Sequence, residues 1–152
     1  MRYISIIIIT LFLLISSGCV SNDSPDINEL TELINEHENI NINNSSIITS
    51  KNKYIEYSYF YNNNILFKAY ADNDSSIICC SITAADENDP IVNELFDSIC
   101  INLCRTDKKT AKDIKDKTEQ IQDLQINFWN FKKIKTPISV CYLIYNDNFA
   151  IQ

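Results

Sequence analysis

Glycine is almost absent from this chain. The 152 residues contain one, Gly18. Phosphate-cradling loops, dinucleotide fingerprints and nucleophile elbows use glycine where the backbone must take a positive φ or approach a ligand closely. Those sites cannot be built here in their usual form, and an EF-hand loop would also lack its turn glycine. We expect asparagine, which tolerates the left-handed region, to serve the turns instead.

Histidine and arginine are scarce as well. His37 is the single histidine, so the chain has no second histidine for a two-histidine metal triad, and no local motif pairs His37 with a cysteine nucleophile. We interpret His37 as a solvated residue near the end of a helix. The formal net charge is −7, and no basic patch is interleaved with aromatic residues. A nucleic-acid partner is therefore not expected.

The chain has one long apolar run, at its amino terminus. Residues 4–15 are apolar except for Ser5 and Thr10, and Arg2 supplies a positive charge in front of them. As a helix this run would measure about 18 Å at about 1.5 Å per residue, whereas a bilayer core is about 30 Å thick. The run is too short to span comfortably, and its layout is typical of a secretory signal peptide. We assign residues 1–18 to that signal.

The residues after this run carry a resemblance to a known kind of signal. Ser16, Ser17 and Gly18 before Cys19 resemble the lipobox of prokaryotic lipoproteins, although Ser16 stands where an aliphatic residue is usual and Ile15 lies one position earlier. The resemblance covers residues 1–19. The residues around Cys19 also resemble those of lipoproteins from methanogenic archaea. It implies that the Cys19 thiol is acylated and anchors the chain to the extracytoplasmic face of the cell membrane. The alternative is an ordinary signal peptide, with Cys19 in a disulfide.

The segment of residues 19–25 is short, and the part that follows the cysteine is polar. We therefore interpret it as a lipid-anchored tether with a reach of about 20 Å when extended. Residues 26–152 then form one domain, since no repeat or second boundary is visible.

Within that domain, apolar residues recur with helical spacing in some segments and with strand spacing in others. Asp26 and Asp89 are plausible helix caps, the second followed by Pro90 at the first helical position. The expected helices cover residues 26–38, 90–105 and 110–125, and the expected strands cover residues 53–61, 65–71, 77–84, 127–135 and 138–147. Runs of strands favour a two-layer α+β fold, an antiparallel sheet of about five strands with helices on one face, in the order α-βββ-αα-ββ.

Removing Cys19 leaves five cysteines, an odd number, so a complete disulfide framework within one chain is excluded. They are Cys79, Cys80, Cys100, Cys104 and Cys141. Their aliphatic neighbours favour packing as small buried hydrophobes. One or two disulfides, or a four-thiolate site made by all but Cys79, are the alternatives. Acidic clusters at residues 72–74 and 86–89 could hold calcium, but caps and turns explain them better. We predict no metal and no cofactor.

Aromatic residues are the most promising candidates for binding. Alternation places Tyr57, Tyr59 and Tyr61 on one face of a strand, and Trp129 belongs to a second aromatic segment. If the helices cover that face, these residues are core. If they do not, the residues form an exposed stripe suited to a protein or glycan partner.

Together these patterns favour a membrane-anchored extracytoplasmic lipoprotein that acts through a binding or accessory domain. The alternative is a small-ligand carrier with an aromatic-lined cavity between sheet and helices. An enzyme is the least expected class, because histidine is scarce and glycine-supported loops are missing. No catalytic residue is predicted.

Overall fold

The computed structural model describes residues 25–36, 47–51, 54–61, 64–118, 120–121, 123–147 and 149. The predicted signal segment, Cys19, most of the tether, His37 and the loop expected at residues 39–46 lie outside them. The elements in chain order are α2 (Ile27–Asn35), β1 (Ile47–Lys51), β2 (Tyr54–Tyr61), β3 (Ile65–Ala71), β4 (Ile77–Ala84), α3 (Pro90–Leu103), α4 (Lys108–Thr118), β5 (Leu124–Ile126), β6 (Trp129–Lys135) and β7 (Val140–Asn146).

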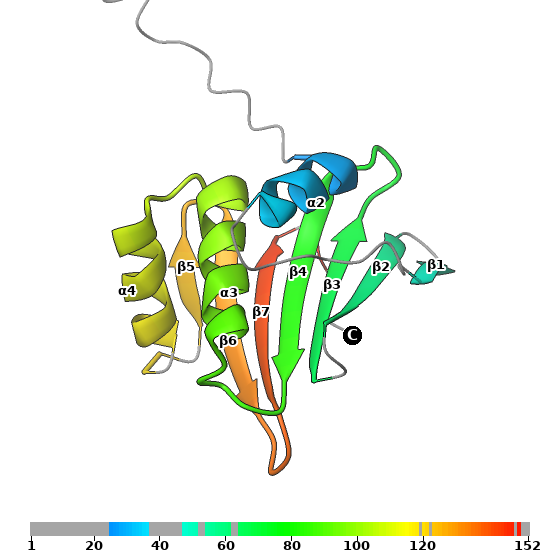
Figure 1. The fold of residues 1–152 in the computed structure, drawn as a ribbon. Helices are drawn as coiled ribbons and strands as arrows, with labels where there is room; N and C mark the ends of the chain where they lie inside the picture. Colours follow the sequence, from blue (N-terminus) through cyan, green and yellow to red (C-terminus); the bar gives the residue numbers. More distant parts are fainter. Residues whose placement is uncertain are drawn as a thin grey trace, which may run out of the picture.

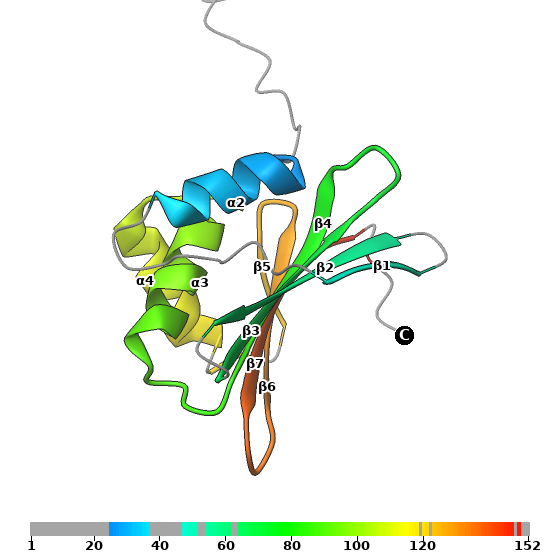
Figure 2. The ribbon, with the colours of Figure 1, turned by 45° about the vertical axis from the view of Figure 1, so that its right-hand side comes forward.

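The strands form one antiparallel sheet in the order β1-β2-β3-β4-β7-β6-β5. The helices pack on one face of this sheet, and the turned view separates the two layers (Figures 1 and 2). The predicted α+β fold is therefore confirmed. The sheet has seven strands rather than about five, because β1 and β5 were not expected.

The end of the third expected helix needs correction. We expected it to run to residue 125 with Ile121 and Leu124 inward, but α4 ends at Thr118. Ile121 is exposed, and Leu124 lies on β5, opposite Phe131. The three-residue step from Ile121 to Leu124 fits a helix, but the two-residue step from Leu124 to Ile126 is the strand period that the structure uses.

Alternation along the strands separates a helix-covered face from an open face, meaning the face on which none of the described helices packs. Strand β3 shows this most simply, since Ile65, Phe67, Ala69 and Ala71 are buried and the residues between them are half-buried. The sequence predicts Ile65, Phe67 and Ala69 on one face of this strand and Leu66, Lys68 and Tyr70 on the other, and that division is confirmed. The largest fully buried side chains, which fill the space between sheet and helices, include Leu30, Ile34, Phe67, Ile82, Leu95, Phe96, Ile99, Ile114, Phe131, Tyr142 and Ile144.

Both predicted caps are present. The Asp26 carboxylate accepts a hydrogen bond from the Glu29 N–H at 2.8 Å, and the Asp89 carboxylate accepts one from the Ile91 N–H at 2.9 Å, with Pro90 at the start of α3. Each cap satisfies a backbone donor that the first turn leaves unpaired. Of the helices described, none is both long enough and apolar enough to cross a membrane.

Candidate functional site

The aromatic residues singled out from the sequence lie on the helix-covered face. Tyr57 and Tyr61 are half-buried against the core, while Tyr59 is 7% exposed and stacks on Phe67 with ring centroids 5.7 Å apart. Trp129 is 6% exposed. The helices cover the face of these residues, and in that case they were expected to be core. A partner could therefore reach only the outer parts of Tyr57 and Tyr61.

The five cysteines divide between the two faces. Cys80, Cys100 and Cys104 belong to the core cluster beneath the helices, whereas Cys79 and Cys141 alternate with core residues and so lie on the open face. All five are free thiols. The sheet separates Cys141 from the other members of the proposed four-thiolate set, and no group of three metal-ligating side chains is found among the residues described.

The site most suited to contact lies at the turn between β6 and β7, residues 136–139, which we call the hairpin tip. The Thr136 N–H donates to the Ser139 carbonyl at 2.8 Å, and the Thr136 hydroxyl accepts from the Ser139 N–H at 3.0 Å. The two hydroxyl groups also lie 2.9 Å apart. These bonds fix the turn, and the turn carries Ile138 with 84% of its surface exposed.

Two hollows of the surface adjoin Ile138. The first, of about 220 Å³, lies between the hairpin tip and the loop after β4, and its lining is Ala85, Asp86, Glu87, Asn88, Lys135, Thr136, Pro137, Ile138, Ser139 and Val140. The second, of about 250 Å³, is more apolar and its lining is Phe60, Asn64, Ile65, Leu66, Thr83, Ala84, Ala85, Ile138 and Ser139. Ile138 therefore stands between a polar hollow and an apolar one.

An apolar row on the open face leads to the second hollow. The register pairs Phe60 with Leu66, Leu66 with Thr83, Thr83 with Cys141 and Cys141 with Ile134, so these five side chains cross the sheet side by side. Phe60 is 48% exposed and Ile134 is exposed too. Together with Ile138 they give this end of the sheet a contiguous apolar surface.

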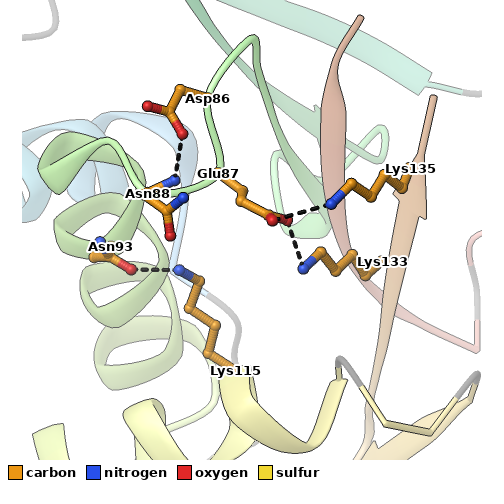
Figure 3. Close-up of polar contacts among 7 residues, drawn as sticks. All are labelled: Asp86, Glu87, Asn88, Asn93, Lys115, Lys133 and Lys135. Atoms are coloured by element: carbon orange, nitrogen blue, oxygen red, sulfur yellow. Dashed lines mark hydrogen bonds and ion pairs between the residues drawn. The ribbon is translucent and has the colours of Figure 1, made fainter. Parts of the chain in front are cut away.

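The loop after β4 is held against β6 by Glu87. The two oxygens of this carboxylate lie 2.9 Å from Lys133 Nζ and 3.0 Å from Lys135 Nζ (Figure 3). Hydrogen bonds from Lys133 and then Lys135 lower the pKa of Glu87 to about 2. Within the loop, the Asp86 carboxylate accepts from the Asn88 N–H at 2.9 Å. The polar hollow thus has a fixed wall.

Behind that wall, a polar cluster joins α3 and α4 to the sheet. Lys115 donates to the Asn93 side-chain carbonyl (Figure 3). The ammonium groups of Lys115 and Lys133 lie 5.2 and 5.4 Å from the centre of the Tyr142 ring, within the range of a cation–π interaction. These contacts explain how lysines can lie at the edge of an apolar interface, and together with the Glu87 ion pairs they connect the loop, α3 and α4 to the sheet.

The chemistry available here favours binding. Glu87 stays ionised and is already paired with two ammonium groups, so its role is to hold the loop in place rather than to exchange protons. A fixed turn that presents an exposed isoleucine loses little conformational entropy when a partner covers it. From the sequence we expected a turn at Thr136 and Pro137 and a strand from Ile138 onward, so Ile138 was not singled out. The structure corrects this, because β7 begins at Val140 and Ile138 lies in the turn. Its exposure had no local signal, because isoleucine is typical of strands.

The hairpin tip lies far from the point where the tether would join the domain. Asp26 forms a bridge with Ser76, just before β4 begins, while the hairpin tip lies beyond the other end of β4. Strand β4 has eight residues, which corresponds to about 26 Å. Figure 1 shows the β6–β7 hairpin projecting from the end of the molecule opposite α2.

Comparisons of this chain with protein-family models, with curated proteins and with solved structures found no match. Function is therefore inferred from the chemistry of the site.

Proposed function

We propose that this protein is a membrane-anchored extracytoplasmic lipoprotein whose folded part is a binding domain, and that the hairpin tip is the surface that contacts its partner. The observation that carries the proposal is Ile138. It is 84% exposed on a turn fixed by hydrogen bonds, between two hollows and beside an apolar row. Contiguous apolar surface of this kind marks interaction sites on folded proteins.

The partner that fits this surface is a protein with an apolar pocket. Ile138, Phe60 and Ile134 offer aliphatic and aromatic area, which proteins bind by excluding water. Lys135 and Asp86, at the wall of the polar hollow, supply charges of both signs for a polar rim. A glycan is less suited, because an aliphatic isoleucine at the centre of the surface offers it no hydrogen bond.

Anchoring through Cys19 gives the hairpin tip a direction. A lipid at Cys19 and a tether of residues 19–25 would hold the Asp26 end of the domain near the membrane. The hairpin tip, about 26 Å away along β4, would then face outward, toward partners at the cell surface. The carrier alternative has less support, since side chains such as Phe96 and Tyr142 fill the space between sheet and helices with about 1% of their surface exposed.

Photo-crosslinking in source-cell membranes tests the binding surface. Phe60 is replaced by benzoylphenylalanine, which keeps an aromatic ring beside the apolar hollow, and Phe128, 64% exposed on the β5–β6 turn, receives the same replacement as a control. We expect a discrete protein adduct from position 60, lost when Ile138→Asn is added, and no such adduct from position 128. An adduct from position 60 that survives Ile138→Asn would refute the role of the hairpin tip.

The anchor is tested separately by mass spectrometry of the membrane-extracted protein and by membrane fractionation of Cys19→Ala. We expect an acylated Cys19 and release of the variant from the membrane fraction. An unmodified cysteine, or a variant that remains bound to membranes, would contradict the anchor and leave the binding surface to its own test.

A further inference from the structure

Cys79 is fully buried although it lies on the open face of the sheet. It alternates with core residues of β4 and lies on the open face, yet it is 0% exposed. Its partners in register are Tyr70 on β3 and Tyr145 on β7. Large side chains thus flank the small Cys79 side chain on both sides.

Phe149, which follows β7, packs against the tyrosines of this part of the open face. Its ring centre lies 5.3 Å from Tyr70, 5.5 Å from Tyr54 and 6.4 Å from Tyr145. Tyr70 and Tyr145 flank the strand of Cys79, so their strands are about 9.6 Å apart, at about 4.8 Å per strand. The small Cys79 side chain leaves a slot between two large rings, and Phe149 contacts both of those rings as well as Tyr54.

A turn directs Phe149 back to the sheet. The Phe149 N–H donates to the Asn146 carbonyl at 3.0 Å, and the Asn130 side-chain amide on β6 donates to the Asp147 carboxylate at 2.9 Å. These two hydrogen bonds hold the short segment that places the Phe149 ring on the sheet. It is not part of a strand or of the helix-covered core.

Burial also raises the pKa of ionisable groups around the slot. Burial, followed by the charges of Glu56 and Cys79, raises the pKa of Tyr70 to about 12. Burial likewise raises the pKa of Tyr145 and of the Cys79 thiol. Burial thus shifts ionisable groups on a patch of the sheet that no described helix covers, although Tyr70 and Tyr145 are themselves half-buried.

We propose that Tyr54, Tyr70 and Tyr145 form a binding slot for an aromatic side chain, and that Phe149 occupies it as an intramolecular ligand which an aromatic residue of a partner peptide can displace. Three rings contributed by three strands surround a single phenyl ring, in tilted contacts that suit aromatic pairs. The slot is distinct from the hairpin tip and does not depend on the function proposed for that surface.

Thiol labelling of the folded protein tests the slot. The rate at which N-ethylmaleimide labels each cysteine is read by mass spectrometry, with the half-buried Cys141 as internal reference and the core residue Cys80 as a reporter of general opening. In Phe149→Ala we expect labelling of Cys79 to rise about tenfold relative to Cys141, while Cys80 stays protected. Phe128→Ala, the matched loss of another phenyl ring, should leave all three rates unchanged.

A peptide supplied in trans tests whether the slot binds. In a variant that ends at Asn146, the peptide DNFAIQ (residues 147–152) at millimolar concentration, the range that a short linker provides, should restore protection of Cys79. The same peptide with Phe149→Ala should not.

Several results would overturn the proposal. In Phe149→Ala, they are an unchanged rate of Cys79 labelling, or a rise at Cys80 that parallels the rise at Cys79. In the peptide experiment, they are restored protection of Cys79 by both peptides or by neither. Full protection of Cys79 in Phe149→Leu would also overturn the proposal, because it would show that an aromatic ring is not required. As a second measurement, ultraviolet titration of Phe149→Ala should show the pKa of Tyr70 falling from about 12 toward its ordinary value of 10.0. An unchanged Tyr70 pKa would also contradict the proposal.

Discussion

At the scale of single residues, Glu87 shows how one side chain fixes the surface around it. Its carboxylate reaches two lysines on β6 from a loop 46 and 48 positions earlier in the chain. That distance in sequence is the reason its partners could not be read from spacing. Glu87 was predicted only as a member of an acidic loop cluster, and the structure makes it the contact that docks this loop on the sheet.

The pH dependence of stability should reveal this contact. Because the folded-state pKa of Glu87 is about 2 and its ordinary value is 4.5, its ion pairs add stability above about pH 4.5 and lose it as the pH falls toward 2. We expect Glu87→Gln to lower the Tm at pH 7 and to match the unaltered protein at pH 2, as measured by circular dichroism.

Asp113→Asn on the exposed surface of α4 removes an equal charge and serves as control, with little expected change in Tm. A Tm difference for Glu87→Gln that persists undiminished at pH 2 would show that its effect does not come from the ion pairs.

At the scale of elements, the sequence predicted what local chemistry decides. The Asp89-Pro90 start of α3 and the alternation of β3 follow from side-chain preferences within a few residues. Strands β1 and β5 were missed because five and three residues carry little periodic signal, and both are edge strands that depend on pairing with a neighbour. The face of Tyr57 was predicted conditionally, since only the position of the helices could decide it.

The aromatic residues show the same limit. Alternation correctly grouped Tyr57, Tyr59 and Tyr61, but it could not show that Tyr54 and Tyr145, on distant strands, converge on Phe149. Within the hairpin tip only Thr136 and Pro137 were predicted as a turn, and Ile138 was placed in the following strand, because its exposure depends on where the surrounding strands end. Grouping along a strand is local, whereas convergence between strands needs the register.

The cap of α3 gives a prediction about an element. Asp89→Ala removes the acceptor for the Ile91 N–H and should destabilise the protein by about 1 kcal/mol. Asp89→Asn, which keeps a side-chain acceptor, should recover most of the loss. Urea unfolding measures both, and equal stability of Asp89→Ala and the unaltered protein would contradict a structural role for the cap.

The hairpin tip gives a second prediction about an element. Thr136→Val keeps the shape of the side chain but removes the hydroxyl that bonds the Ser139 N–H and carbonyl, so the turn should lose about 1 kcal/mol of stability. Amide hydrogen exchange of residues 138 and 139 should accelerate in Thr136→Val and remain slow in Thr136→Ser. Equal exchange in both variants would mean that the hydroxyl does not fix the turn.

At the scale of the whole molecule, the two ends of the sheet differ. The Asp26 end is where the proposed tether would join, and the opposite end carries Ile138, the apolar row and the two hollows. Helices cover one face, and the open face is partly closed by Phe149. This arrangement suits a small domain held at a membrane that presents one fixed apolar surface outward.

The central claim is that Ile138 contacts a partner, and saturable binding tests it most directly. The lipid-free chain, residues 20–152, is labelled and titrated onto membranes from the source cells, with Phe128→Asn as the control for loss of an exposed apolar side chain. We predict saturable binding that Phe128→Asn preserves and that Ile138→Asn weakens at least about tenfold, as for a residue at the centre of an interface. Equal binding by Ile138→Asn and the unaltered chain would contradict it.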